Sequence, residues 1–230
     1  MQVHGFGSSV KSYKVEEIIS TKTKRKQNVK VLKLSGGVGL CLEINDDLMA
    51  LQCNEGFLHN QMVELGRSNT NAKRPNITIL GGGDGGILKS CLNLNPRSVK
   101  LLELDDEIIK ICQKYLPHIS KNAFKDKRVK TILGDAFDNI KKIRRNSQDL
   151  IFVDMADAAV TEDNQVFGPR SDILLLNIKK CLKENGVVVA QASGYQQQTL
   201  STFKKYFENT YGWTDSFNLQ HANSFVYAIK

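Results

Sequence analysis

The sequence lacks any apolar run near 18 residues, which is the length that a helix needs to cross a bilayer. It therefore predicts no membrane span. It also lacks the compositional extremes of unusual chains, because 41% of its 230 residues are hydrophobic and 24% are charged. These fractions are ordinary for a globular protein, and they argue against disorder, collagen or coiled coil over the whole chain.

The cysteines follow no disulfide or metal-binding pattern. There are five of them (Cys41, Cys53, Cys91, Cys112 and Cys181), an odd number without a C-x-x-C pair. Such scattered thiols predict a reduced, cytoplasmic protein without a zinc site. The N-terminus has no apolar signal core, and its first fifteen residues are rich in Ser and Lys but contain no Arg. We expect a cytoplasmic location, with a mitochondrial one as the alternative.

Positive charge is in excess, with a net charge of +8 and a pI near 9.2. Two runs carry it: residues 1–34 and residues 121–145 each have a net charge of +6, which leaves the rest of the chain net acidic. Neither run interleaves aromatic with basic residues, and the sequence has no zinc-finger spacing or basic zipper. We therefore interpret both runs as solvated surface and keep nucleic-acid binding as the weaker alternative.

The pattern of apolar residues divides the chain into two parts. Residues 1–65 predict a small β-hairpin domain, with strands at 29–34 and 38–44 around a Ser-Gly-Gly turn and a helix at 55–66. The polar residues 66–75 predict a linker, and strand–helix alternation then continues from residue 76 to residue 230.

This alternation predicts an α/β fold, a mostly parallel, doubly wound sheet with helices on both faces. The predicted strands are 77–80, 99–104, 129–133, 150–153 and 187–191, with a final pair around 217 and at 225–229; the predicted helices are 87–94, 106–116, 136–143, 171–182 and 199–206. The helix at 171–182 is expected to close at the Asn-Gly pair 185–186. Ligands of such folds bind beyond the carboxyl ends of the strands.

Polar and acidic residues recur at those carboxyl ends. They are the loop Gly81-Gly82-Gly83-Asp84-Gly85-Gly86, then Glu103, then Asp135 with Ala136, then Asp154 and Asp157, and finally Gln191. A single Asp after a strand is often only a helix N-cap, but four strand ends in succession behind a glycine-rich loop favour a binding site.

The spacing of these residues indicates a nucleoside ligand with a positive tail. Glu103 lies 20 residues after Gly83, the spacing at which an acid accepts hydrogen bonds from ribose hydroxyls. Asp84 would repel a pyrophosphate but would attract a cation. We therefore expect S-adenosylmethionine or a derivative rather than NAD.

The segment Ile79–Leu88, which reads ILGGGDGGIL, resembles the signature of the spermidine/spermine synthases, the polyamine aminopropyltransferases. The resemblance continues through Glu103-Leu104-Asp105, Gly134–Phe137 and Asp154–Asp157, and it covers nearly the whole chain. It implies a Rossmann-like, class I methyltransferase-like fold without a metal or cofactor. It also implies a homodimer or membership of a larger complex.

The resemblance implies a reaction and a role for each site residue. The donor would be decarboxylated S-adenosylmethionine and the acceptor putrescine or spermidine, with methylthioadenosine released. Asp154 would take the proton of the attacking amine, and Asp157 and Gln191 would bind the acceptor. Donor binding would fall to Gln27, Gln52, Gly81, Gly82, Gly83, Asp84, Gly85, Glu103, Asp135 and Ala136, with Asp84 on the donor ammonium and Asp135 at the adenine edge.

The chain departs from the family pattern at two acceptor-side motifs. Met155 and Ala156 replace the Ser-Ser pair of the family's Asp-Ser-Ser-Asp-Pro motif, and His59-Asn60-Gln61 stands where the family has Tyr-His/Gln-Glu. Two alternatives to an active aminopropyltransferase therefore stay open. One is a structural or regulatory subunit of a larger assembly that has lost catalysis, and the other is a methyltransferase on the related fold.

Overall fold

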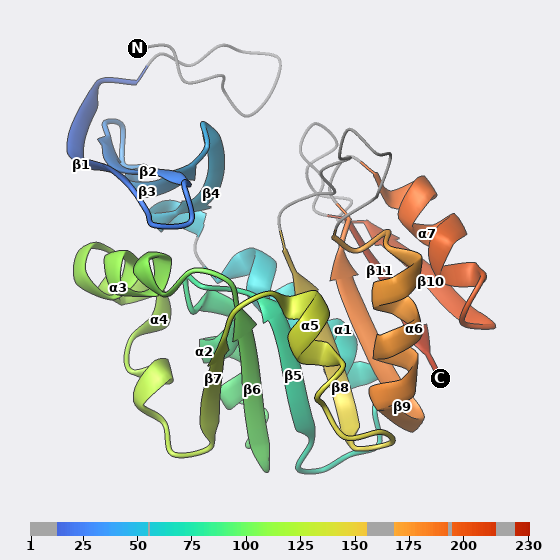
Figure 1. The fold of residues 1–230 in the computed structure, drawn as a ribbon. Coiled ribbons are helices and arrows are strands. Elements are labelled where there is room, and N and C mark those ends of the chain that lie inside the picture. The colour runs from blue at the N-terminus through green and yellow to red at the C-terminus, as the bar shows by residue number, and fades with distance from the viewer. Residues whose placement is uncertain (1–12, 55, 156–167, 193–194, 215–223) are drawn as a thin grey trace.

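The computed structural model describes residues 13–54, 56–155, 168–192, 195–214 and 224–230. These residues form two sheets, a four-stranded antiparallel sheet at the N-terminus and a seven-stranded sheet that carries helices on both faces (Figure 1). Within them, no helix is long and apolar enough to cross a membrane. The mostly parallel α/β fold predicted from the strand–helix alternation is confirmed.

The N-terminal sheet has the strand order β1-β2-β3-β4. The strands are β1 (Val15–Lys22), β2 (Asn28–Leu34), β3 (Gly39–Ile44) and β4 (Asp47–Leu51), followed by the short helix η1 (Gln52–Asn54). The predicted hairpin is β2–β3, whose turn contains two glycines with positive φ, Gly36 and Gly37. Sequence analysis did not predict β1 and β4, the two outer strands that complete the sheet.

The larger sheet has the strand order β10-β11-β9-β8-β5-β6-β7, and only β11 runs antiparallel to its neighbours. Its strands are β5 (Asn76–Gly81), β6 (Ser98–Glu103), β7 (Val129–Leu133), β8 (Gln148–Asp154), β9 (Leu182–Gln191), β10 (Asn209–Thr214) and β11 (Ser224–Ile229). The central strands β5 and β8 are almost fully buried, because helices cover both of their faces. This burial explains why they read as continuous apolar runs.

Two helical layers enclose the sheet. The helices are α1 (Phe57–Ser68), α2 (Gly86–Leu92), α3 (Asp106–Tyr115), α4 (Pro117–Ser120), η2 (Ala123–Lys125), α5 (Ala136–Ile140), α6 (Asp172–Cys181) and α7 (Gln196–Lys204). On one face α1, α2 and α3 bury Met62, Ile87 and Ile109, and on the other α5, α6 and α7 bury Ile140, Leu174 and Phe203. The division of the chain at residues 65 and 75 stays a prediction.

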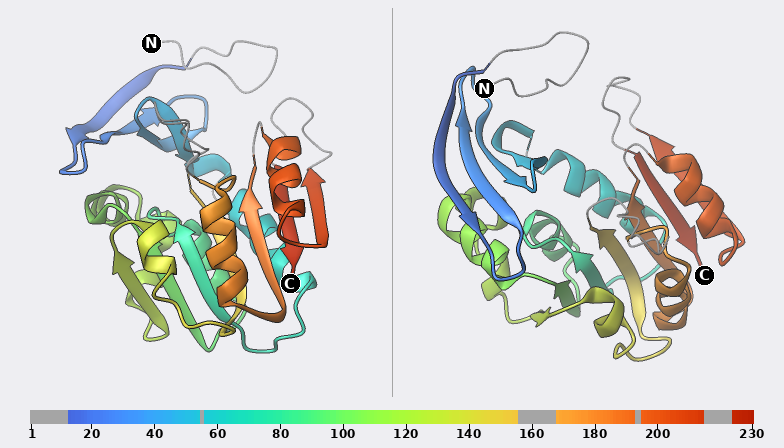
Figure 2. Two further views of the ribbon diagram at one scale, coloured as in Figure 1. Left: turned by 45° about the vertical axis from the view of Figure 1, so that its right-hand side comes forward. Right: turned by 45° about the horizontal axis from the view of Figure 1, so that its top comes forward.

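The N-terminal sheet packs on the larger unit through α3 and α4. Val29, Val31 and Leu42 of the sheet share a buried cluster with Ile108 of α3 and Ile119 of α4. Figure 2 shows the four-stranded sheet above the same end of the larger sheet at which the parallel strands finish. The hairpin therefore lies beside the edge where the sequence predicts the ligand site.

Several predicted boundaries are wrong. The predicted closure at residues 185–186 lies inside β9, because Asn185 and Gly186 exchange backbone hydrogen bonds with Lys230 and keep this segment in the sheet. The last helix begins at Gln196 rather than at 199, and α5 ends at Ile140 rather than at 143. The strand expected around residue 217 is found at 209–214, and residue 217 lies outside the described residues.

Candidate active site

The two central strands β5 and β8 meet at the topological switch point of the sheet. The chain leaves β5 for α2 on one face and leaves β8 for α6 on the other face, and α/β folds bind their ligands in the crevice that such a switch point forms. Gly81 and Asp154, the last residues of these strands, are partners in register. The Gly82 N–H donates to the Asp154 carbonyl at 3.0 Å, so the glycine loop is tied to the end of β8.

The glycine loop passes so close to β8 that a side chain cannot fit. A Cβ atom at Gly81 would lie 2.1 Å from the Asp154 carbonyl oxygen, and its φ of +81° also favours glycine. The loop then turns into α2, where the Asp84 carboxylate accepts a hydrogen bond from the Gly86 N–H at 2.8 Å. Asp84 is thereby fixed at the mouth of the crevice, with its side chain only 12% exposed.

A histidine from α1 lies between two of the acids. His59 Nε2 is 3.6 Å from Asp154 Oδ2 and 3.9 Å from Asp84 Oδ2, and all three side chains are at least 88% buried. The other side of the ring packs against the backbone of α2, since a Cβ atom at Gly86 would lie 2.3 Å from Nδ1. A carboxylate of the glycine loop and the carboxylate at the end of β8 therefore lie beside the same imidazole nitrogen.

Glu103 adds a third acid at the end of β6. Its carboxylate packs against the glycine loop, since a Cβ atom at Gly83 would lie 2.8 Å from Oε2. Oε1 accepts a hydrogen bond from the Asp105 N–H at 3.0 Å. Burial raises the pKa of Glu103 to about 7, and the charges of Asp105 and Asp154 act in the same direction, whereas backbone N–H groups oppose the shift. The site thus brings three carboxyl groups together beside one histidine.

The other predicted residues at the carboxyl ends lie on both sides of this centre. Asp135 is exposed and caps α5, because its carboxylate accepts from the Phe137 N–H at 2.7 Å, and Ala136 is buried behind it. Gln191 ends β9 opposite Phe225 of β11 and is partly buried. Asp157 lies outside the described residues, so its predicted role in acceptor binding stays a prediction.

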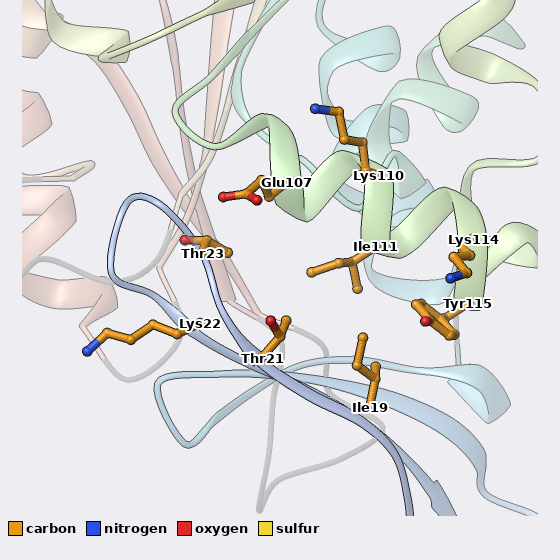
Figure 3. Close-up of a pocket in the computed structure, with 9 residues that line it drawn as sticks. All are labelled: Ile19, Thr21, Lys22, Thr23, Glu107, Lys110, Ile111, Lys114 and Tyr115. Carbon is orange, nitrogen blue, oxygen red and sulfur yellow. The ribbon is translucent and has the colours of Figure 1, made fainter.

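The N-terminal sheet approaches the site through the turn between β1 and β2. The Lys24 N–H donates to Glu107 Oε2 at 2.6 Å, at the start of α3 and four residues after Glu103. Figure 3 shows Thr23 of this turn facing Glu107, above a pocket of about 250 Å³ between β1 and α3. Gln27 lies on the same turn and is partly buried. Its backbone N–H donates to the Thr23 hydroxyl at 3.3 Å. The predicted role of Gln27 in donor binding stays a prediction.

Gln52 has a defined structural contact. Its side-chain oxygen accepts from the Leu40 N–H at 2.8 Å, and the side chain lies over Gly39, where a Cβ atom would be 2.4 Å away. This contact joins η1 to the start of β3. The predicted role of Gln52 in donor binding stays a prediction.

Sequence analysis did not place His59 in the site. The residue is part of the amphipathic pattern of α1, where Met62 and Val63 belong to the core, and a partly buried histidine on such a face is ordinarily structural. Its acidic neighbours are 25 and 95 residues away in sequence. In the sequence, the one sign of a functional role for His59 is its place in His59-Asn60-Gln61, the motif that differs from the Tyr-His/Gln-Glu of the family.

Known proteins resemble this chain over most of its length. Residues 55–215 match the family model of the spermine/spermidine synthase domain. The chain belongs to the spermine/spermidine synthase family. This membership confirms the resemblance predicted from the glycine loop and the acidic strand ends.

Two relatives and one solved structure show the extent of the match. A polyamine aminopropyltransferase of Prochlorococcus marinus (strain MIT 9312) is 32% identical over 176 residues, which are 74% of this chain and 60% of that protein. Polyamine aminopropyltransferase 1 of Hyperthermus butylicus is 27% identical over 240 residues, 94% of this chain and 76% of that protein. The crystal structure of a spermidine synthase in complex with the transition-state analogue AdoDATO has the same fold, with a TM-score of 0.80 and 22% identity over 93% of this chain and 73% of that one.

Proposed function

We propose that this chain is an aminopropyltransferase that moves an aminopropyl group from decarboxylated S-adenosylmethionine to putrescine or spermidine. One observation carries the proposal: the buried carboxylates of Asp84, Glu103 and Asp154 surround a glycine loop at the switch point of the sheet. Such a site attracts a cationic nucleoside and repels a phosphate. Family membership and the aminopropyltransferase names of the relatives support the same reaction, although the chain spans only 60% of the Prochlorococcus protein.

The acids suit the groups of this donor one by one. Glu103, beside the loop, would accept hydrogen bonds from the ribose hydroxyls, and these O–H donors would stabilise its ionised form. Asp84 would pair with the ammonium of the aminopropyl tail. Asp135 and the Ala136 backbone would contact the adenine edge beside β7. The reaction would need no metal or other cofactor, because the sulfonium of the donor is itself the leaving group.

The chemical step would take place beside Asp154. The neutral nitrogen of the acceptor attacks the carbon of the aminopropyl group that is bonded to sulfur. A carbon–nitrogen bond forms, and the bond between this carbon and sulfur breaks. The sulfur keeps the bonding electrons, so methylthioadenosine leaves uncharged. The new secondary ammonium transfers a proton to the Asp154 carboxylate, which acts as the general base. His59, 3.6 Å from that carboxylate, would hold it toward the crevice.

We extend the proposal to the acceptor and to the assembly. Asp157 and Gln191 would bind the distal amine of the acceptor, and two copies of the chain would form a homodimer or join a larger complex. Size-exclusion chromatography with light scattering tests the assembly. A mass of one chain at micromolar concentration would rule out the homodimer.

An enzyme assay tests the reaction itself. Purified protein is incubated with decarboxylated S-adenosylmethionine and either putrescine or spermidine, and methylthioadenosine is measured by chromatography. We expect one of the two amines to support turnover. Absence of product with both amines, in protein that still binds methylthioadenosine, would favour the non-catalytic subunit. Transfer of a methyl group from intact S-adenosylmethionine would favour the methyltransferase.

A further inference from the structure

A second polar pocket lies at the opposite end of the large sheet, and it is basic. It has a volume of about 590 Å³, within the range of small-molecule sites. Four cationic side chains line it, together with amides, one hydroxyl and two isoleucines, but no acid: Lys100, Lys130, Lys142 and Arg144, with Asn76, Asn139, Gln148, Ser147, Ile132 and Ile143. The active-site acids are at the carboxyl ends of the strands, whereas this pocket is at the amino ends.

The short helix α5 leaves this part of the sheet open. Lys100 of β6 and Lys130 of β7 are partners in the parallel register, so their side chains leave the same face side by side. The neighbouring residues Leu102 and Ile132 on that face pack under α5 and α6, but α5 ends at Ile140. Figure 1 shows α5 in front of the central strands β5 and β8, clear of the lower ends of β6 and β7.

The charges of Lys100 and Lys130 repel one another. Lys100 is partly buried, and its pKa is lowered first by burial and second by the charge of Lys130. Among the described residues, no carboxylate forms an ion pair with any of the four cations that line the pocket. The nearest acids of the run in sequence, Asp126 and Asp138, pair with other cations. An anion would therefore relieve this repulsion.

The polar groups at the base of the pocket are held in place by hydrogen bonds. Gln148 is buried and accepts from the Thr78 hydroxyl at 2.8 Å, while its amide nitrogen donates to Ser147 at 2.7 Å. Asn139 is also buried, and its side-chain oxygen accepts from Lys142 Nζ at 2.9 Å. The cations thus surround an ordered polar floor rather than a freely moving surface loop.

We propose that this pocket binds a compact polyphosphate group, either inorganic or part of a nucleotide. Four cations in one pocket match the charge of a di- or triphosphate better than that of a single phosphate. The concave shape favours a small molecule over single-stranded RNA, and no aromatic side chain lines the pocket for base stacking. The basic run at 121–145, which the proposed reaction leaves unexplained, would then have a ligand.

Calorimetric titration with inorganic pyrophosphate tests the proposal, because this anion has no nucleoside that could enter the active site. We expect saturable binding of one anion per chain that weakens as salt is raised. Lys100→Gln combined with Lys130→Gln should reduce the affinity at least tenfold. The matched control removes two charges of the same run outside the pocket, Lys127→Gln with Lys141→Gln, and should change the affinity less than twofold.

Three results would overturn the proposal. The first is no saturable binding of pyrophosphate, and the second is an equal loss of affinity in both double variants. The third is that a short single-stranded RNA binds more tightly than pyrophosphate and loses affinity equally in both double variants. If Lys100→Gln with Lys130→Gln does not fold by circular dichroism, Arg144→Gln on its exposed segment replaces it, with the same expected direction. A parallel titration with ATP separates the sources of the polyphosphate. If ATP binds more tightly than pyrophosphate, and excess methylthioadenosine does not change its affinity, the ligand is a nucleotide. If ATP and pyrophosphate bind equally, the pocket recognises the phosphate chain alone.

Discussion

The two ends of β6 carry opposite charges, and within the described part of the chain neither Glu103 nor Lys100 forms an ion pair. Glu103 ends the strand beside the glycine loop, and Lys100 lies three residues earlier beside Lys130. Burial is the largest cause of both pKa shifts: it raises the pKa of the carboxyl to about 7 and lowers that of the ammonium. Each shift means that the charged form is less stable in the folded protein than in water. A parallel sheet can thus present an acidic site and a basic pocket on the same strand.

The comparison also explains the net charge of the chain. A total of +8 suits neither a cationic donor nor a cationic acceptor. The acids gather at the carboxyl ends, where the backbone N–H groups of helix starts hold them, as Gly86 holds Asp84. Much of the excess positive charge lies elsewhere, in the runs at 1–34 and 121–145. Local placement, rather than the total, decides what each end can bind.

Removal of Asp154, the proposed base, is the strongest test of the acidic site at the carboxyl ends of the strands. Asp154→Asn keeps the shape and the hydrogen-bonding size of the side chain but cannot take the amine proton. We expect turnover to fall about 10²- to 10⁴-fold, measured as methylthioadenosine released. Asp149→Asn is the control at the other end of the same strand, where the carboxylate pairs with Lys183 at 2.8 Å. It should leave turnover within about twofold of the wild type, and unchanged turnover in Asp154→Asn would refute the role of that residue.

Neutralising Glu103 should stabilise the ligand-free protein at high pH. Because its folded pKa of about 7 lies above the ordinary value of 4.5, ionisation costs folding free energy as pH rises from 4.5 through 7. Glu103→Gln should therefore raise the unfolding free energy by about 2–3 kcal/mol at pH 8 and by less than about 1 kcal/mol at pH 5. Urea unfolding at both pH values measures the difference.

Glu64 supplies a control of opposite sign for that measurement. It pairs with Arg67, which holds the pKa of the Glu64 carboxyl below its ordinary value. Its contribution to stability is present above the ordinary pKa and is lost as pH falls. Glu64→Gln should therefore lower stability slightly at pH 8. A stability gain in both variants would show that the effect of Glu103→Gln does not come from the burial of this carboxyl.

The close approach between the loop and Glu103 gives a smaller effect. A Cβ atom at Gly83 would lie 2.8 Å from Glu103 Oε2, so Gly83→Ala should displace the carboxylate from the place at which we propose that it binds ribose. We expect the affinity for methylthioadenosine to fall about tenfold, which corresponds to about 1.4 kcal/mol. Gly212→Ala in β10, where a Cβ atom would lie 3.3 Å from Gln196, is the control and should bind normally. Equal affinities in the two variants would show that the Glu103 position does not limit nucleoside binding.

Removal of one lysine at the basic end should have the smallest effect, and it should stabilise. The lowered pKa of Lys100 means that its charge is unfavourable in the folded state below that pKa. Lys100→Met should raise the unfolding free energy by a few tenths of a kcal/mol at low salt, a gain that screening diminishes. Lys141→Met, which loses an exposed pair with Asp138, should give no gain. A loss of stability in Lys100→Met would contradict the repulsion inferred for the pocket.

The acidic end could be predicted from the sequence because its residues follow strands of clear pattern. Strand–helix alternation fixes which residues end or follow the parallel strands, so the sequence alone predicts that Asp84, Glu103 and Asp154 lie close together. His59 could not be predicted in this way. Its closeness to two of these acids depends on how α1 packs across the sheet, and a helical pattern predicts only that one face is buried.

The basic end shows the same limit more clearly. The run at 121–145 is visible in the sequence, but half of the pair that defines the pocket, Lys100, lies outside it. The pairing depends on the register of β6 and β7 and on the point at which α5 ends, which the sequence predicted three residues too late. A charge run therefore does not show which of its members share a pocket.

The sequence by itself determined the family, the parallel sheet and the order of acids at its carboxyl ends, because local periodicity and motif spacing are carried by neighbouring residues. Only the tertiary structure decided that His59 stands between Asp84 and Asp154 and that Lys100 lies beside Lys130. Those contacts join segments that are 25 to 95 residues apart, and their geometry follows from helix packing and strand register. Burial then shifts the pKa values of Glu103 and Lys100 in opposite directions, which no pattern of neighbouring residues could show.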